Sequence, residues 1–172
     1  MSFSASLSNT GTLAGSGTVV LPRSGFTNEG VIAPGVGGVG SLDIVGDLML
    51  GSGSDLQFEL ASLGSFDTLA LDGDITVGGE LSIWNLGYTP TIGDSFVIMT
   101  FDQSIDGLVF DNVSWNGFGA GVVFDVLYNA DNITLVAAVP EPAEYAMMLA
   151  GLALVGTIAR RRRAMARGAN AG

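Results

Sequence analysis

Asp72 and Asp74 are the residues whose type and spacing come nearest to catalytic chemistry in this chain. On one strand, two carboxylates at this spacing would share a face, and paired carboxylates can hydrolyse glycosides by acid and base action. Gly73 between them indicates a turn, where acidic residues are ordinary solvated groups. We therefore expect no enzymatic activity and no catalytic residue. The alternative is a polysaccharide-active enzyme that uses Asp72 and Asp74.

Residues 51–55, Gly-Ser-Gly-Ser-Asp, are similar to the start of a calcium-binding repeat rich in glycine and aspartate. The pattern occurs once, and Gln57 stands where such a repeat needs an apolar residue. A calcium ion takes about six to eight oxygen ligands. We therefore expect no specific metal site.

Aromatic side chains could form a platform on which sugars stack. Trp115 begins the loop-like run Trp-Asn-Gly-Phe-Gly, so we expect it to be the most exposed of them. Packing in the core or at one end of the fold is the favoured interpretation for the group, which comprises Trp84, Tyr88, Trp115, Phe118 and Tyr128.

Composition excludes several classes of function. The 172 residues include no cysteine and no histidine, which removes disulfides, Cys/His zinc sites, a cysteine nucleophile and a Ser-His-Asp triad. Seventeen acids against six bases give a net charge of -11, which argues against nucleic acid as a partner. We expect no cofactor.

The charge changes sign near residue 140. Residues 1–139 hold 15 acids and one base, Arg23, for a formal charge of 1 - 15 = -14, whereas residues 140–172 hold two acids and five arginines, for +3. Pro140-Glu141-Pro142 stands at this change, and two prolines in three residues continue neither a central strand nor a helix. We place the domain boundary there.

The run from Tyr145 to Ala159 is uncharged and is followed at once by Arg160 to Arg163. As a helix it would span about 22 Å, against about 30 Å for the hydrocarbon core of a bilayer. It is short for a lasting anchor but can span if arginines snorkel and the bilayer thins. The positive-inside rule keeps the arginine end cytoplasmic. The membrane-helix residues we single out are Tyr145, Leu149, Leu152, Leu154 and Ile158, and the basic stop is Arg160, Arg161, Arg162 and Arg163.

The string VPEPAEYAMMLAGLALVGTIARRRR resembles the PEP-CTERM sorting signal of Gram-negative bacteria. It has that signal's three parts in order, namely the tripeptide Pro140, Glu141 and Pro142, the apolar helix and the arginine stop. The resemblance implies export, recognition at the inner membrane by an exosortase, and release or transfer to the cell surface, usually in species that make exopolysaccharide. It also implies a secretory signal peptide, for which the opening MSFSASLSNTGTLAGSG has neither a basic nor an apolar region. We expect the chain to be N-terminally truncated.

The residues before the tail predict an all-β fold, in which short apolar alternations are separated by glycine-rich turns. The pairs Gly46-Asp47 and Gly73-Asp74 lie 27 apart, Leu56 and Leu81 lie 25 apart, and Asn9-Thr10-Gly11 recurs 19 residues later as Asn28-Glu29-Gly30. Such periods indicate the stacked turns of a β-solenoid. The alternative is a β-sandwich.

Gly121–Tyr128 and Asn132–Val136 predict a closing hairpin around Asn129-Ala130-Asp131, which would cap the last turn of the solenoid. Pieces such as FDTLALDGDITVGGELSI and ADNITLV make residues 9–136 similar to the passenger β-helix of autotransporters. That resemblance implies a β-helix ectodomain.

We thus expect an acidic β-solenoid in residues 1–138, a sorting signal in 139–163 and a disordered cytoplasmic tail in 164–172. The function expected is that of an exported structural or interaction protein, sorted by exosortase through the inner membrane and associated with exopolysaccharide or biofilm. A permanently membrane-anchored adhesin is the alternative.

Overall fold

The structure is a computed structural model that describes residues 7–22, 25–104, 107 and 109–138. By its internal contacts the chain divides into Met1–Val139 and Pro140–Gly172. The described part contains strands and no helix, which confirms the all-β fold expected for it. No helix within it is long and apolar enough to cross a membrane. The apolar helix expected at residues 145–159 lies outside the described residues.

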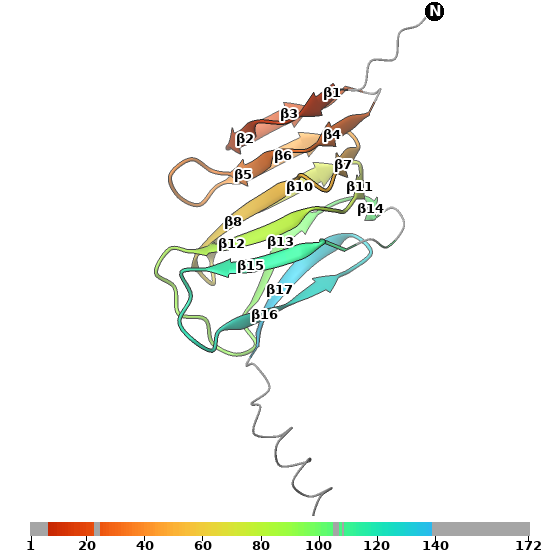
Figure 1. Ribbon diagram of the computed structural model, residues 1–172. Coiled ribbons are helices and arrows are strands. Elements are labelled where there is room, and N and C mark those ends of the chain that lie inside the picture. Colours follow the sequence, from red (N-terminus) through yellow and green to blue (C-terminus); the bar gives the residue numbers. More distant parts are fainter. Residues whose placement is uncertain (1–6, 23–24, 105–106, 108, 139–172) are drawn as a thin grey trace, which may run out of the picture. The chain divides into compact units, whose positions relative to one another are not determined.

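The strands form three sheets, each open at its two edges (Figure 1). The first sheet has the order β1 (Leu7–Asn9), β4 (Phe26–Asn28), β7 (Leu48–Leu50), β11 (Asp74–Thr76) and β14 (Gln103–Ser104). The second has β2 (Thr12–Gly15), β5 (Val31–Pro34), β8 (Asp55–Ser62), β12 (Glu80–Asn85) and β15 (Asn112–Asn116), with β9 (Ser65–Phe66) paired to β8. The third has β3 (Gly17–Val20), β6 (Ser41–Val45), β10 (Thr68–Asp72), β13 (Ser95–Thr100), β17 (Asn132–Ala138) and β16 (Val123–Tyr128).

From β1 to β15 the chain visits the three sheets in turn, and each visit after the first round adds a strand parallel to the one before it in that sheet. The sequence repeats fall in register, because Asn9 pairs with Asn28 and Leu56 with Leu81. The repeat alignment read from the sequence is confirmed at these positions. Parallel sheets do not fit the β-sandwich alternative, whose two sheets are antiparallel. The β-solenoid stays a prediction.

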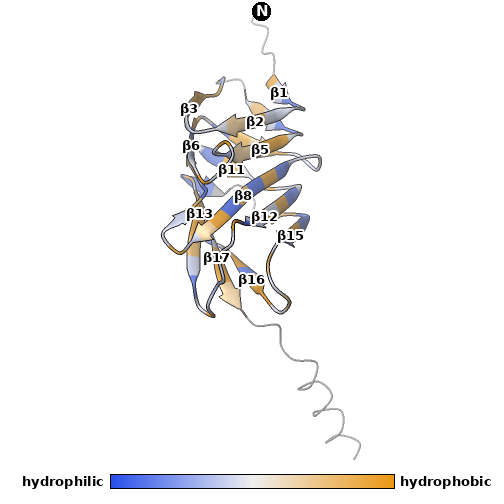
Figure 2. Cartoon of the chain, turned by 90° about the vertical axis from the view of Figure 1, so that its left-hand side faces the viewer, coloured by the Kyte–Doolittle hydropathy of each residue, from blue (hydrophilic) through white to orange (hydrophobic). Residues whose placement is uncertain are grey.

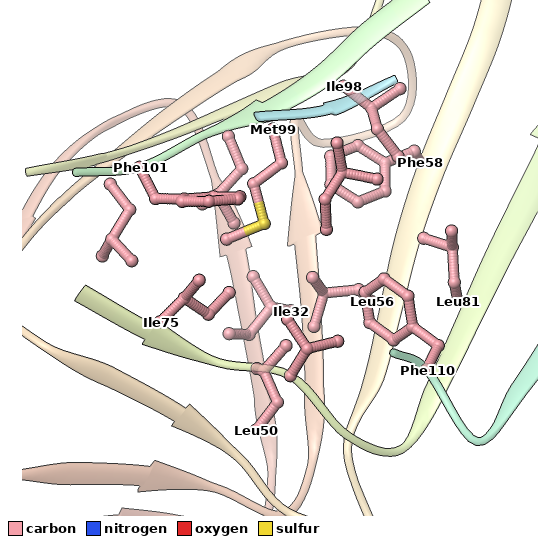
Figure 3. Packing of buried hydrophobic residues seen from close by; sticks show 14 of the residues in the cluster. Ile32, Leu50, Leu56, Phe58, Ile75, Leu81, Ile98, Met99, Phe101 and Phe110 are labelled. Carbon is pink, nitrogen blue, oxygen red and sulfur yellow. The ribbon is translucent and has the colours of Figure 1, made fainter. Parts of the chain in front are cut away.

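Alternate residues of each strand point inward and stack from turn to turn. In the second sheet Ile32, Leu56 and Leu81 pair in sequence, and all three are fully buried. Figure 3 shows them in one cluster with buried side chains of the other two sheets, among them Ile75 and Ile98. Burying each such side chain contributes about 1.5–3 kcal/mol. Figure 2 shows the matching alternation of hydrophilic and hydrophobic residues along β8 and β12.

An antiparallel hairpin follows the last parallel strands. β17 pairs with β13 on one side and with β16 on the other, and Asn129 N–H donates to the Asn132 carbonyl across the turn. This pairing confirms the predicted hairpin. Phe124 of β16 packs against the rings of Trp115 and Phe118, at centroid distances of 5.3 and 5.1 Å. The hairpin thus covers the core at this end with aromatic side chains.

A ladder of polar side chains joins the turns where the first sheet meets the second. Asn9 Nδ2 donates to Asn28 Oδ1 at 2.7 Å, and Asn28 Nδ2 donates to Ser54 Oγ at 2.6 Å and to the Gly30 carbonyl at 2.7 Å. Asn28 is 0% exposed. Because a buried amide without partners is unfavourable by about 1–3 kcal/mol, this ladder allows an amide inside the corner and fixes the register of three turns.

We predict that Asn28→Ala lowers the free energy of unfolding by about 3 kcal/mol, because it removes three side-chain hydrogen bonds, two of them buried, and leaves the buried Ser54 hydroxyl without its Asn28 partner. Asn112→Ala, at an exposed position of β15, is the control and should change it by less than about 0.5 kcal/mol. Urea unfolding of the two variants measures both values. Equal effects would mean that the ladder does not set the stability.

Candidate functional site

The sorting residues predicted from the sequence lie outside the described part of the chain. This holds for Pro140, Glu141 and Pro142, for the apolar run 145–159 and for the arginines 160–163. Their roles stay predictions, and the described residues supply the remaining candidate sites.

Asp72 and Asp74 lie on different strands and do not share a strand face, and the turn expected at Gly73 is confirmed. Asp72 ends β10 in the third sheet and Asp74 begins β11 in the first, because the chain turns at Gly73. Asp74 N–H donates to Asp47 Oδ1 at 3.0 Å, and Gln103 Nε2 donates to Asp74 Oδ2 at 3.2 Å. These acids therefore join successive turns at a corner. Asp72 and Asp74 therefore lack the shared strand face on which the glycoside-hydrolysis alternative rested.

The carboxylate of the calcium-like segment 51–55, that of Asp55, is engaged by protein groups. Asp55 Oδ1 accepts from Ser82 Oγ at 2.7 Å, and Asp55 Oδ2 accepts from Gln57 Nε2 at 2.6 Å. The Glu29 carboxylate accepts from the Gly53 N–H at 3.0 Å. Within the described ranges, no three acidic side chains gather as metal ligands would.

Trp115 is not the exposed aromatic residue, which corrects the sequence-based expectation. It belongs to β15, pairs with Ile83 and points inward, where it is half-buried against Phe124. Trp84, the neighbour of Ile83, points outward and is 45% exposed. The favoured interpretation, packing, fits Trp115, Phe118 and Tyr88, whereas Trp84 and Tyr128 are exposed.

Trp84 stands at one side of a groove of about 330 Å³ on the second sheet. Gln57 and Glu59 of β8 lie in the groove, together with Asp67, which follows β9. The opposite wall is the start of the glycine-rich loop 35–40. We call this feature the Trp84 groove.

Asp67 fastens the glycine-rich loop to the sheet. It is 1% exposed, and its Oδ1 accepts from Gly40 N–H at 2.6 Å while its Oδ2 accepts from Glu59 N–H at 2.8 Å. Its pKa is raised from 3.8 to about 6, chiefly by burial; the two N–H groups oppose this rise and the Glu59 carboxylate adds to it. Sequence reasoning missed Asp67, since a lone aspartate carries no signal of its partners.

Comparison with known proteins identifies one segment. Residues 138–163 match the PEP-CTERM protein-sorting motif, while no curated protein matches the chain. The match supports an exosortase-sorted extracellular protein, exported by membrane sorting to the cell surface. The resemblance seen in the tail is thereby confirmed at the level of the motif.

We predict that Asp67 makes stability depend on pH between about 4 and 6. Its raised pKa means that the native state binds this proton more tightly than the unfolded chain does, so its contribution is full below about pH 4 and is lost as the pH rises through about 6. Over that range the protein should lose up to about 3 kcal/mol relative to Asp67→Asn. Urea unfolding across the range measures the difference.

The control for this prediction is Asp43→Asn, which changes an exposed aspartate of β6. Its unfolding free energy should follow the unmodified protein at every pH. If the curve of Asp67→Asn also runs parallel to that of the unmodified protein, Asp67 does not titrate as described.

Proposed function

We propose that the chain is an exported structural or interaction protein that an exosortase sorts to the cell surface or extracellular matrix, where it associates with exopolysaccharide. The match of residues 138–163 to the sorting motif carries the proposal. The described part supports it, because all of its charged side chains are acidic, which favours solubility in a hydrated matrix.

We further propose that residues 1–138 form a short β-solenoid with a hairpin cap. The support is the parallel pairing of each turn with the next and the antiparallel β16–β17 hairpin after the last of them. A solenoid suits this function, because stacked turns expose long, regular faces for binding. No observation favours the permanently anchored adhesin or the enzyme that uses Asp72 and Asp74.

The proposed sorting has two steps. The apolar run 145–159 inserts into the inner membrane with Arg160 to Arg163 on the cytoplasmic side, which retains the exported part. The exosortase then recognises Pro140-Glu141-Pro142 and cleaves nearby. The transpeptidase chemistry belongs to the exosortase, and this chain supplies the substrate.

We predict that the protein recovered from exosortase-containing cells has lost the residues beyond about Pro142. The double variant Pro140→Ala/Pro142→Ala should keep them, because it removes the recognition motif. Intact-mass and C-terminal peptide analysis of membrane and medium fractions measures this. The control is Pro90→Ala, in the loop before β13, which should be processed normally.

Two outcomes would contradict the proposal. An intact C-terminus in cells that contain the exosortase would make the tail a lasting anchor. Equal processing in cells without the enzyme would assign the cleavage to another protease.

A further inference from the structure

The outer face of the second sheet carries polar side chains in register from turn to turn. Across β8, β12 and β15 the outward rows are Asp55, Glu80 and Asn112, then Gln57, Ser82 and Ser114, then Glu59, Trp84 and Asn116. Neighbouring strands lie about 4.8 Å apart. The face is therefore a regular lattice of hydrogen-bonding groups with one exposed aromatic ring in it.

Hydrogen bonds within this face fix some groups and leave others available. Ser114 Oγ donates to Ser82 Oγ at 3.3 Å, Ser82 Oγ donates to Asp55, and Gln57 Nε2 donates to the same carboxylate. The Gln57 amide is thereby oriented, and its carbonyl oxygen remains an acceptor. Within the described ranges, no side-chain donor bonds the Glu59 carboxylate, which lies beside Trp84 in register.

Trp84 supplies an apolar surface at the edge of the groove. Its 45% exposed ring stands between Glu59 and Asn116 on the neighbouring strands. Facing it across the groove is the glycine-rich loop, whose Val36 is 83% exposed. Asp67 holds the far end of that loop through Gly40. An aromatic face with a few oriented polar groups is the usual composition of a small-molecule site, and about 330 Å³ is at the small end of such sites.

We propose that the Trp84 groove binds an uncharged pyranose unit of a polysaccharide, an inference that rests on the proposed extracellular function. The C–H face of the ring would stack on Trp84. Its hydroxyl groups would donate to the Glu59 carboxylate and the Gln57 carbonyl oxygen, and Asn116 would meet the next unit.

Charge selects the class of sugar. Asp55, Glu59 and Glu80 make the face anionic, and the described residues include no lysine or arginine. A uronate, sulfate or phosphate group would meet like charges with no cation to offset them, and a like charge close by is unfavourable. The groove therefore favours neutral sugars over acidic ones.

The test is titration calorimetry of the full chain in a polyoxyethylene detergent, whose head group contains no sugar. The probes are neutral hexasaccharides of glucose, galactose and mannose, with hexagalacturonate as the acidic counterpart. At least one neutral hexasaccharide should bind. Trp84→Ala should weaken that binding at least about tenfold, which corresponds to about 1.4 kcal/mol.

Three further measurements make the test decisive. Glu59→Gln should weaken binding several-fold without lowering the melting temperature, since the variant loses a surface acceptor and also loses the repulsion between Glu59 and Asp67. Trp115→Phe, which keeps an aromatic ring against Phe124, should leave the affinity within about twofold. Hexagalacturonate should bind at least about tenfold more weakly than the neutral probe.

Absence of binding by every neutral hexasaccharide, preference for hexagalacturonate, or equal loss in Trp84→Ala and Trp115→Phe would each overturn the inference. These outcomes are independent of sorting. If the protein is processed correctly but binds none of the probes, the sugar-binding inference is wrong and the proposed function stands. If the chain binds a neutral probe but is never processed, the inference stands and the proposed sorting is wrong.

Discussion

Register between successive turns is the constraint on which the rest of this structure depends. Each strand of a parallel sheet finds its backbone partners one turn away, so a shift by one residue would turn every inward side chain outward. Asn9, Asn28 and Ser54 bind one another directly across three turns and tie the corner to a single alignment. Once that alignment holds, Ile32, Leu56 and Leu81 necessarily stack in one column of the core. The core and the corners therefore specify the same register independently.

The same register builds the outer face. If Leu81 and Ile83 point inward, the alternation of a strand leaves Trp84 outside, and pairing with β8 and β15 sets Glu59 and Asn116 beside it. Trp115 is displaced by one position from Trp84 in this alignment, and so it packs inside against Phe124. Two tryptophans in similar sequence surroundings thus take opposite roles, one in the core and one on the surface, through a single step of register.

These relations show which features could be predicted from the sequence. Three features were predictable, because each follows from the local alternation of apolar residues or from a sequence repeat. They are the pairing of Leu56 with Leu81, the Gly-Asp corners and the terminal hairpin. The exposure of Trp115 was predicted wrongly, because the glycines that follow it indicated a loop although Trp115 itself lies within a strand. The environment of Asp67 was not predictable, although Gly40 lies at the repeat spacing of 27 residues. The repeat indicates which residues are neighbours, but a single aspartate carries no pattern that shows its carboxylate to be buried and bonded to two N–H groups.

The corners between the strands explain part of the acidity of residues 1–139. Turn residues leave backbone N–H groups without a strand partner, and a buried donor of this kind must be satisfied. Carboxylates accept from such groups repeatedly, as at Gly53, Gly40, Asp74 and Gly79, whose partners are Glu29, Asp67, Asp47 and Asp111. In each of these acids at least one carboxylate oxygen is used as an acceptor for a corner N–H group. Glu59 differs, since it projects from the middle of a strand beside an exposed aromatic ring. Other acids also stand on strand faces, but Glu59 is the strand acid that lies in the Trp84 groove, and it is the pairing of that carboxylate with the exposed ring that distinguishes the groove.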